Sequence, residues 1–369
     1  MTQQETGARF PTVGDGSPSD GSVTFTPEEL QLAFRNRGMP LEALRYPITP
    51  TGMHYLLTHF DVPEVDGATW QLGVNGLVSK ELTLDLGAIR ARPATTLAVT
   101  MECAGNGRAL LTPRPLSQPW LLEAISTAEW TGTPLRGVLE EAGIADAAVE
   151  VLFTGLDRGV QGEEVQYYQR SLSVAEATRP EVLLAYEMNG APLEPQHGFP
   201  LRLLVPGWYG MTSVKWLDRI EVLAEPFDGF QMAGYAYRQT PDEPGVPVDL
   251  VRVRALMIPP GIPDFMTRMR LVEAGPVTLK GRAWAGRASI VRVEVSVDDA
   301  TTWADAELEP EGSPYVWRGW SFAWDAEPGR HTLSVRATDD AGGVQPIEQS
   351  WTVAGLGNNM AQRVSVLVE

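Results

Sequence analysis

The chain has 369 residues and a formal net charge of −18, from 29 Lys and Arg residues against 47 Asp and Glu residues. This acidic balance argues against nucleic acid as a partner, because binding a phosphate backbone requires a basic face. The sequence contains no run of about 18 apolar residues, so we expect no membrane span. The length predicts two domains, each able to bury a hydrophobic core.

Residues 1–45 are predicted to form an N-terminal arm, flexible over residues 1–23. Its first 20 residues are polar and lack the apolar segment of a secretory signal. We therefore expect a cytoplasmic protein, or a periplasmic one if a signal peptide has been removed. Thr26 and Pro27 are residue types preferred at the N-cap and first position of a helix, which predicts a short helix up to Phe34.

Cys103 is the only cysteine in the chain. It follows residues 95–100, a β-branched and apolar run that predicts a strand, and it precedes a Gly-Asn-Gly turn and Arg108. A single thiol of this kind can be a small buried hydrophobe, a soft metal ligand or a nucleophile, and the residue type alone does not decide. The guanidinium of Arg108 could hold an oxyanion near the thiol.

Two further strands are predicted beyond the cysteine. Residues 150–155 indicate a buried strand, and Asp157 lies in the loop that follows it, where functional sites are commonly built. Residues 183–188 are apolar and run into Asn189-Gly190, which predicts a tight hairpin.

Residues 201–205 predict a buried strand that contains Arg202. A buried arginine needs an anionic partner, either an internal carboxylate or a bound anion. The turn at residues 210–215 brings backbone N–H groups together with Ser213 and Lys215, which makes it a plausible seat for a phosphate group. No GxGxxG or P-loop pattern occurs, so a nucleotide site is not indicated.

The C-terminal third has the pattern of a β-sandwich. A Pro-rich stretch at residues 241–247 looks like a linker or a loop that shapes one. Beyond it, short alternating strands separated by Gly, Asp and Pro turns are typical of an immunoglobulin-like domain. The predicted strands cover residues 277–284, 290–297, 317–324 and 331–339.

Four stretches, in chain order, resemble the sulfite oxidase family of molybdenum enzymes. They are residues 103–108, 124–132, 197–202 and 214–217. The resemblance covers roughly residues 45–369. It implies an α+β fold, with a molybdopterin-binding catalytic domain over residues 46–247 and an immunoglobulin-like dimerisation domain over residues 248–369. It also implies a homodimer.

The resemblance implies a cofactor and a set of site residues. Molybdenum would be carried by a pterin dithiolene and bound by the thiolate of Cys103. No haem is expected, because no Cys-x-x-Cys-His motif occurs. The residues expected to contact the pterin are Tyr55, His59, Asp157, His197, Arg202, Ser213 and Lys215. The residues expected at the reacting centre are Arg108, Arg363, Tyr235 (with Tyr237 as the alternative) and Trp130, the last as a wall of the substrate funnel or as core packing.

The activity implied is oxidation of sulfite to sulfate by oxygen-atom transfer, with the electrons passed to a separate acceptor such as a cytochrome or oxygen. One residue departs from the family pattern: Leu57 stands where the family has an arginine of its anion pocket. Two other functions stay open. Residues 48–55 resemble the branch that oxidises protein-carried sulfane sulfur, and a non-catalytic immunoglobulin-like binding protein would leave Cys103 merely buried.

Overall fold

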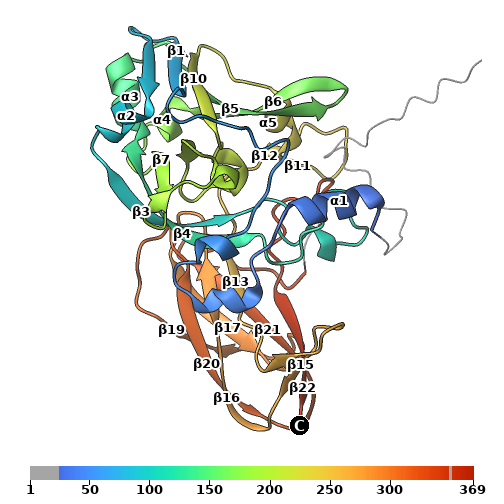
Figure 1. The fold of residues 1–369 in the computed structure, drawn as a ribbon. Coiled ribbons are helices and arrows are strands. Elements are labelled where there is room, and N and C mark those ends of the chain that lie inside the picture. The colour runs from blue at the N-terminus through green and yellow to red at the C-terminus, as the bar shows by residue number, and fades with distance from the viewer. Residues whose placement is uncertain (1–24, 349–350) are drawn as a thin grey trace, which may run out of the picture.

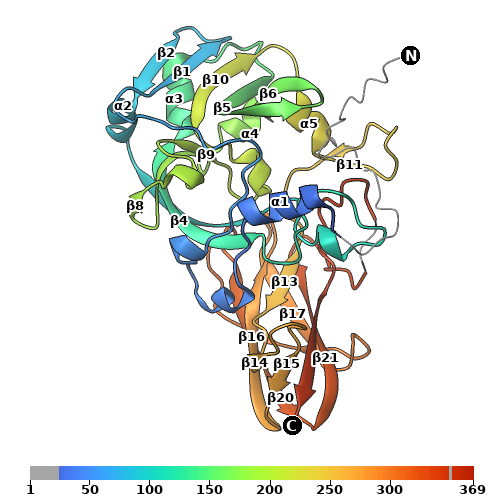
Figure 2. The same cartoon turned by 45° about the vertical axis from the view of Figure 1, so that its right-hand side comes forward.

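The computed structural model describes residues 25–348 and 351–369. Two β-rich parts lie one above the other, with the C-terminus at the far end of the second part (Figures 1 and 2). The first part combines two sheets with short helices, and the second is a sandwich of two sheets. This arrangement confirms the predicted α+β domain followed by a β-sandwich.

The outer sheet of the first part has five strands in the order β2-β1-β10-β5-β6. The β1–β10 pair is parallel and the other pairs are antiparallel. The β5 strand contains the predicted buried run, whose residues from Val151 to Thr154 are buried. The strands are β1 (Gln71–Gly76), β2 (Leu82–Asp85), β5 (Glu150–Gln161), β6 (Glu164–Ser173) and β10 (Leu217–Leu223).

The second sheet of the first part, which we call the inner sheet, contains the strand that ends directly before Cys103. Its order is β3-β4-β7-β8, and β9 pairs with β7. Asn189 and Gly190, both with positive φ, form the predicted tight turn between β7 and β8. The strands are β3 (Thr95–Glu102), β4 (Ile125–Pro134), β7 (Leu183–Met188), β8 (Ala191–Pro192) and β9 (Arg202–Leu204).

Short helices fill the spaces around these sheets. The predicted helix start is confirmed at α1, where Thr26 and Glu29 form a capping box and Pro27 is the first helical residue. The α-helices are α1 (Pro27–Arg35), α2 (Leu86–Arg90), α3 (Leu135–Ala142), α4 (Val174–Ala177) and α5 (Phe230–Gly234). The 3-10 helices are η1 (Leu41–Arg45), η2 (Thr51–Met53), η3 (Arg108–Leu110), η4 (Pro195–His197) and η5 (Gly210–Thr212).

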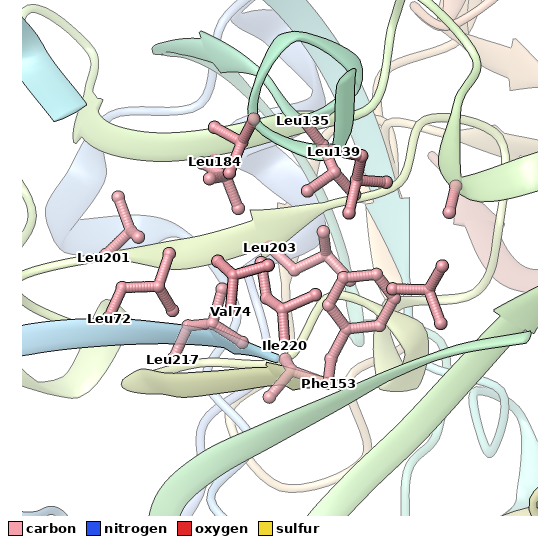
Figure 3. Packing of buried hydrophobic residues seen from close by; sticks show 14 of the residues in the cluster. Leu72, Val74, Leu135, Leu139, Phe153, Leu184, Leu201, Leu203, Leu217 and Ile220 are labelled. Atoms are coloured by element: carbon pink, nitrogen blue, oxygen red, sulfur yellow. The ribbon is translucent and has the colours of Figure 1, made fainter. Parts of the chain in front are cut away.

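The main core of the first part lies between its two sheets (Figure 3). Strands β1, β5 and β10 contribute Val74, Phe153 and Ile220 from one side. Leu139 on α3 and Leu184 on β7 meet them from the other side, and all five side chains are almost fully buried. Packing of this kind fixes the two sheets relative to each other, and so fixes the loops that leave their ends.

The second part is a sandwich with orders β13-β16-β20-β19 and β14-β15-β22-β21-β17-β18. All four strands predicted from alternation are present, as β16, β17, β20 and β21. The first sheet contains β13 (Arg254–Met257), β16 (Gly275–Trp284), β19 (Glu307–Leu308) and β20 (Arg318–Ala326). The second contains β14 (Ile262–Pro263), β15 (Arg270–Val272), β17 (Ile290–Ser296), β18 (Ala304–Asp305), β21 (Gly329–Asp339) and β22 (Gln362–Val368).

The Pro-rich stretch between the two parts is a hairpin loop. Strand β11 (Ala236–Tyr237) pairs with β12 (Val246–Pro247), and Arg238 Nε donates to the carbonyl oxygen of Glu243 at 2.9 Å. The chain therefore turns back here, and the crossing to the sandwich comes after β12.

The described part of the N-terminal arm is packed, although the sequence suggests a peripheral decoration. Met39 and Leu44 are fully buried. The carbonyl oxygen of Leu44 accepts a hydrogen bond from Arg282 Nε on β16, at 3.0 Å. Residues 1–23, predicted to be flexible, lie outside the described residues. Among the residues described, no helix is long and apolar enough to span a bilayer.

Candidate active site

Cys103 lies directly after β3 and is buried. Burial raises the pKa of its thiol, and the positive charge of Arg108 opposes that rise. Cys103 lines two adjacent cavities of about 180 Å³ and about 60 Å³, which we call the larger and the smaller cavity. Leu57 and His59 also line both cavities, so these three residues mark their junction.

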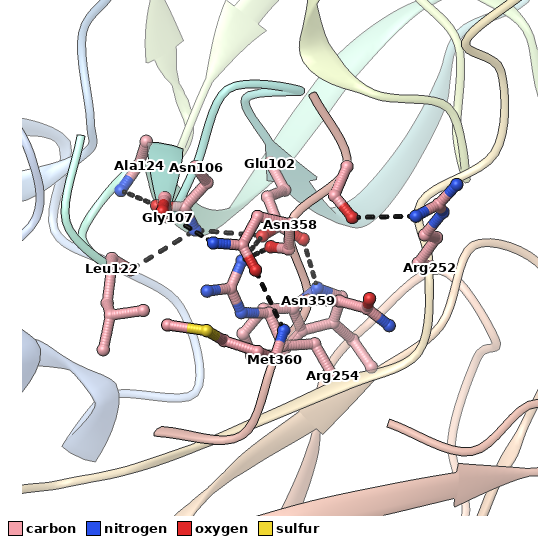
Figure 4. Close-up of polar contacts among 12 residues, drawn as sticks. Glu102, Asn106, Gly107, Leu122, Ala124, Arg252, Arg254, Asn358, Asn359 and Met360 are labelled. Atoms are coloured by element: carbon pink, nitrogen blue, oxygen red, sulfur yellow. Dashed lines mark hydrogen bonds and ion pairs between the residues drawn. The ribbon is translucent and has the colours of Figure 1, made fainter. Parts of the chain in front are cut away.

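The loop after Cys103 is held rigidly by buried polar groups (Figure 4). Asn106 Nδ2 donates to Glu102 Oε1 at 2.9 Å, and Asn106 Oδ1 accepts from the backbone nitrogen of Ala124 at 3.1 Å. Gly107 has a φ of +88°, and a Cβ at this residue would lie 2.9 Å from Nδ2 of Asn358. Glycine is therefore required by both the backbone conformation and the close approach of the C-terminal segment.

The smaller cavity is lined by all seven residues that the sequence predicts to contact a pterin. They are Tyr55, His59, Asp157, His197, Arg202, Ser213 and Lys215. These residues come from segments up to 160 positions apart, which the two sheets bring together. His54 and Tyr168 line the same cavity and were not predicted. His54 lies within residues 48–55, which resemble the branch that oxidises sulfane sulfur. That resemblance was the one sequence signal that could have pointed to His54.

Several buried polar atoms around the smaller cavity lack a hydrogen-bond partner within the described chain. They are Nε2 of His54, Nε2 of His197, Oδ1 of Asp157 and Nε of Arg202. The other guanidinium nitrogens of Arg202 donate to the carbonyl oxygens of His197 and Ser213, both at 3.1 Å. An unsatisfied buried polar group costs about 1–3 kcal/mol, so four of them beside one cavity indicate a polar ligand.

Burial controls the charges in the smaller cavity. It lowers the pKa of His59 to about 3 and the pKa of His197 to about 2, so both rings are neutral near pH 7. Burial raises the pKa of Asp157 to about 7 and, together with Arg202, lowers the pKa of Lys215 to about 7. Burial lowers the pKa of Arg202 to about 10, so its guanidinium stays charged near pH 7. The cavity therefore suits an anionic group.

The side chain of Lys215 is held in one orientation by two hydrogen bonds. Its Nζ donates to the carbonyl oxygens of Leu57 and Gln196, at 2.9 Å and 3.1 Å. It also lies 4.2 Å from the ring centroid of Trp216, whose backbone has a positive φ of 49°. The lysine is thus held at the cavity wall rather than extended into solvent.

The larger cavity contains a cation, a phenol and an imidazole. Arg108 Nε donates to the carbonyl oxygen of Ala354 at 2.7 Å, and its Nη1 donates to that of Gln118 at 3.2 Å. Tyr235 Oη lies 2.7 Å from His59 Nε2. Burial raises the pKa of Tyr235, so the phenol stays protonated while it is hydrogen-bonded to the neutral histidine.

The rest of the larger cavity is mostly apolar. Apolar side chains converge on it from α1, from the loops around residues 57 and 120, from α5 and from the C-terminal segment. They are Leu32, Leu57, Phe60, Trp120, Phe230 and Leu356.

Two predicted residues at the reacting centre lie elsewhere. Arg363 is on β22, where it forms ion pairs with Asp299 at 3.3 Å and Glu348 at 2.6 Å, and it lines neither cavity. The C-terminal segment does reach the larger cavity, but it does so through Ala354 and Leu356. Arg363 lies on β22 opposite Ser334 of β21, within the sandwich sheet and away from both cavity linings, so the prediction for this arginine is corrected.

Trp130 is fully buried in β4 and lines neither cavity, so it is not a funnel wall. Its ring centroid lies 4.7 Å from the guanidinium carbon of Arg202, so Trp130 packs against a residue that lines the smaller cavity. The tryptophan that does line the larger cavity is Trp120, from a Pro-rich loop without periodicity that could have revealed it. Tyr235 lines the larger cavity, whereas the alternative Tyr237 does not.

Comparison with known proteins agrees with this geometry. Residues 59–231 match the family described as the oxidoreductase molybdopterin binding domain, and residues 253–369 match the Mo-co oxidoreductase dimerisation domain. The chain belongs to the sulfite oxidase family of molybdopterin-dependent oxidoreductases. The resemblance seen in the four sequence stretches is thereby confirmed.

Members of this family with different substrates are similar to the chain. A chicken sulfite oxidase is 35% identical, over 84% of this chain and 71% of the chicken protein. A barley nitrate reductase is 32% identical, over 96% of this chain and 43% of the barley protein. The structure of the sulfane dehydrogenase SoxCD from Paracoccus pantotrophus has a TM-score of 0.79 and 25% identity, covering 94% of this chain and 88% of that one. The chain spans 62% of the length of the mammalian sulfite oxidases that it matches.

The residues present fit a molybdopterin. The four unsatisfied polar atoms and the charged Arg202 offer what a polar, phosphate-bearing pterin requires. Within residues 25–348 and 351–369, no group of three or more His, Cys, Asp or Glu side chains could hold a metal ion alone. Cys103 would supply a soft thiolate ligand, and a metal carried by a dithiolene brings further ligands of its own.

Proposed function

We propose that this protein oxidises sulfite to sulfate with a molybdenum cofactor and passes the electrons to a separate acceptor. The observation that carries the proposal is the place of Cys103. It lies at the junction between a cationic cavity that fits a pterin and a second cavity that contains Arg108. When bound, the cofactor supplies oxygen-atom transfer and holds two electrons.

The smaller cavity binds and orients the cofactor. Cys103 is the metal ligand, and Arg202, Ser213 and Lys215 bind the anionic end of the pterin. The neutral rings of His59 and His197 and the carboxyl group of Asp157 make the remaining polar contacts, and Tyr55 packs beside them. Binding of the pterin would give these atoms the hydrogen-bond partners that the described chain does not provide.

Arg108 binds the substrate anion. Two of its nitrogens are held by carbonyl oxygens, which fixes the plane of the guanidinium and leaves Nη2 without a hydrogen bond in the described chain. A charge-assisted hydrogen bond from Nη2 to a sulfite oxygen would hold the sulfur lone pair toward Cys103. Because Leu57 contributes no charge, affinity for sulfite should be modest.

Tyr235 and His59 serve proton movement. The hydrogen bond with Nε2 of His59 holds the Tyr235 hydroxyl in place, and the hydroxyl relays protons between the reacting centre and water while burial keeps the imidazole neutral. Two protons must leave the site for each sulfite oxidised, and this pair is the polar route between the two cavities.

The second domain indicates how the chain assembles with other copies of itself. We propose that residues 253–369 form a homodimer, because that region matches a dimerisation domain. We also propose that the acceptor is a separate protein such as a cytochrome, or oxygen. A second candidate function, oxidation of protein-carried sulfane sulfur, is favoured by the similarity to the SoxCD structure.

The test combines metal analysis of purified protein with sulfite-dependent dye reduction. We expect molybdenum bound in proportion to protein and dye reduction that requires sulfite. Cys103→Ser should remove turnover while the far-ultraviolet spectrum and the oligomeric state stay unchanged. Bound molybdenum with no response to sulfite, but with a response to a peptide persulfide, would favour the second candidate. Protein free of molybdenum, from cells able to make the cofactor, would leave the binding-protein alternative.

A further inference from the structure

We infer that the larger cavity takes organic sulfinates, R–SO₂⁻, and that the protein oxidises them to sulfonates in preference to sulfite. This inference rests on the proposed function, since it assigns a substrate class to the same site. It is carried by the charge, the size and the apolar wall of the larger cavity.

The charge of the cavity matches a monoanion. Arg108 and Glu163 are the residues with a full charge among the described residues that line it, and their charges are opposite. Burial keeps His59 neutral there. A sulfite dianion would therefore bring two negative charges to one guanidinium, with a carboxylate at the rim and a protein of net charge −18 around it. A sulfinate brings one negative charge, which Arg108 alone can balance.

The cavity is larger than sulfite requires. A water molecule needs about 10–15 Å³ of such space, so the cavity of about 180 Å³ holds roughly 12–18 water-sized positions. Sulfite consists of one sulfur and its oxygens and would leave most of this space to water. A substituent of the size of a phenyl ring would fill it.

The apolar part of the wall of the larger cavity is well fixed. Leu32 belongs to α1, which is tied down by the buried ion pair between Glu29 and Arg114. At the end of that helix, Asn36 Nδ2 donates to Gln118 Oε1 at 2.9 Å, and Asn36 Oδ1 accepts from the backbone nitrogen of Thr58 at 2.7 Å. These contacts hold Leu32 and Leu57 on the same cavity, so the wall is part of the folded structure and can bind an apolar group without rearrangement.

The specificity residue is Leu57. It lines both cavities, as Cys103 does, so it is placed at their junction, where the substituent on the reacting sulfur would enter. An apolar side chain there favours a carbon substituent and provides no partner for a second oxyanion charge.

The reaction balances as R–SO₂⁻ + H₂O → R–SO₃⁻ + 2 H⁺ + 2 e⁻. One S–O bond forms at the sulfur lone pair, the oxygen comes from water, and the C–S bond stays intact. Sulfur loses two electrons, which leave singly to a one-electron acceptor such as ferricyanide or a ferric cytochrome, and the two protons go to solvent.

The experiment uses the molybdenum-loaded protein with ferricyanide as acceptor and compares sulfite, methanesulfinate and benzenesulfinate. We expect kcat/KM for benzenesulfinate to exceed that for sulfite by about tenfold or more, with methanesulfinate between them. Chromatography should find one benzenesulfonate for every two ferricyanides reduced. As a readout independent of turnover, calorimetry should show tighter binding of the product benzenesulfonate than of sulfate.

Substitutions at Leu57 separate charge from shape. Leu57→Arg should lower the KM for sulfite by about tenfold and raise the KM for benzenesulfinate, which reverses the preference. Leu57→Gln, a smaller change that also guards against misfolding, should weaken benzenesulfonate binding without improving sulfate binding. Val165→Arg adds the same charge at an exposed residue that does not line the cavity, and should leave the preference unchanged.

The outcomes distinguish the two proposals. Oxidation of sulfite with slower or no oxidation of both sulfinates would overturn this inference and leave the proposed function standing. Loaded protein that oxidises none of the three compounds would refute both. Equal changes in Leu57→Arg and Val165→Arg would mean that overall charge, and not the cavity wall, sets the preference.

Discussion

Replacing Arg254 with methionine should destabilise the chain strongly, because it leaves a buried carboxylate without its charged partner. Arg254 lies on β13 of the sandwich and Glu102 lies at the end of β3, directly before Cys103. Their side chains are almost fully buried, and Arg254 Nη1 lies 2.6 Å from Glu102 Oε1 (Figure 4). This ion pair joins the two parts of the molecule beneath the metal-ligand loop.

The magnitude follows from the contacts of the pair. Glu102 also accepts hydrogen bonds from Asn106 Nδ2 at 2.9 Å and from Trp284 Nε1 at 2.8 Å, and these would remain. Removing one partner of a buried ion pair costs about 3–5 kcal/mol. Arg254 Nε and Nη2 have no partner among the described residues, so methionine also relieves a desolvation cost. We therefore expect the free energy of unfolding to fall by about 3 kcal/mol, the lower end of that range.

Differential scanning calorimetry measures this loss as a fall in Tm of about 6–12 °C, from about 2–4 °C per kcal/mol for domains of this size. The double variant Glu102→Gln with Arg254→Met should recover at least half of the fall, because no unpaired charge is left. Arg136→Met, which breaks the exposed pair with Glu140, is the matched control and should leave Tm nearly unchanged. A fall below about 2 °C in Arg254→Met would refute the reasoning.

Two further predictions concern the site. Tyr235→Phe should lower kcat for sulfite by about a hundredfold with KM little changed, because the phenol moves protons and does not bind the anion; a changed KM with unchanged kcat in steady-state assays would contradict this role. Burial lowers the pKa of His54 from 6.5 to about 4, so the unfolded chain binds a proton that the folded chain does not. The contribution of the neutral His54 to the free energy of unfolding is fully present above pH 6.5. It is lost as the pH falls toward 4, by up to about 3 kcal/mol. His54→Gln should therefore show a smaller fall in the urea midpoint between about pH 7 and pH 4.5 than the unsubstituted protein, and an equal fall would show that His54 does not cause it.

Much of the local structure could be predicted from the sequence. Thr26 and Pro27 mark the start of α1, Asn189-Gly190 marks the hairpin of β7 and β8, and the alternation over residues 290–297 marks strand β17, although residues of both faces are buried at its end. Each of these signals depends on the preferences of a few neighbouring residues, which the chain carries wherever it folds.

The site was predicted in part. Cys103 and the seven residues of the smaller cavity were recognised, because they occur in motifs that can be compared position by position. Arg363 was misplaced, Trp130 took the core-packing role that had been left open for it, and Trp120 was missed, because being near a motif does not show which way a side chain faces. The pairing of β22 and the path of the Pro-rich loop decide that direction.

By itself, the sequence determined the classes of element, the order of the two domains and the cysteine on which the chemistry depends. Only the tertiary structure decided that α1 closes one wall of the larger cavity and that Glu102 pairs with Arg254, 152 residues away in the chain. The physical reason is that local preferences act over a few residues, whereas cavities and buried charges depend on contacts between segments that are distant in sequence. Such contacts are fixed by how the sheets pack, and no short stretch of sequence carries that information.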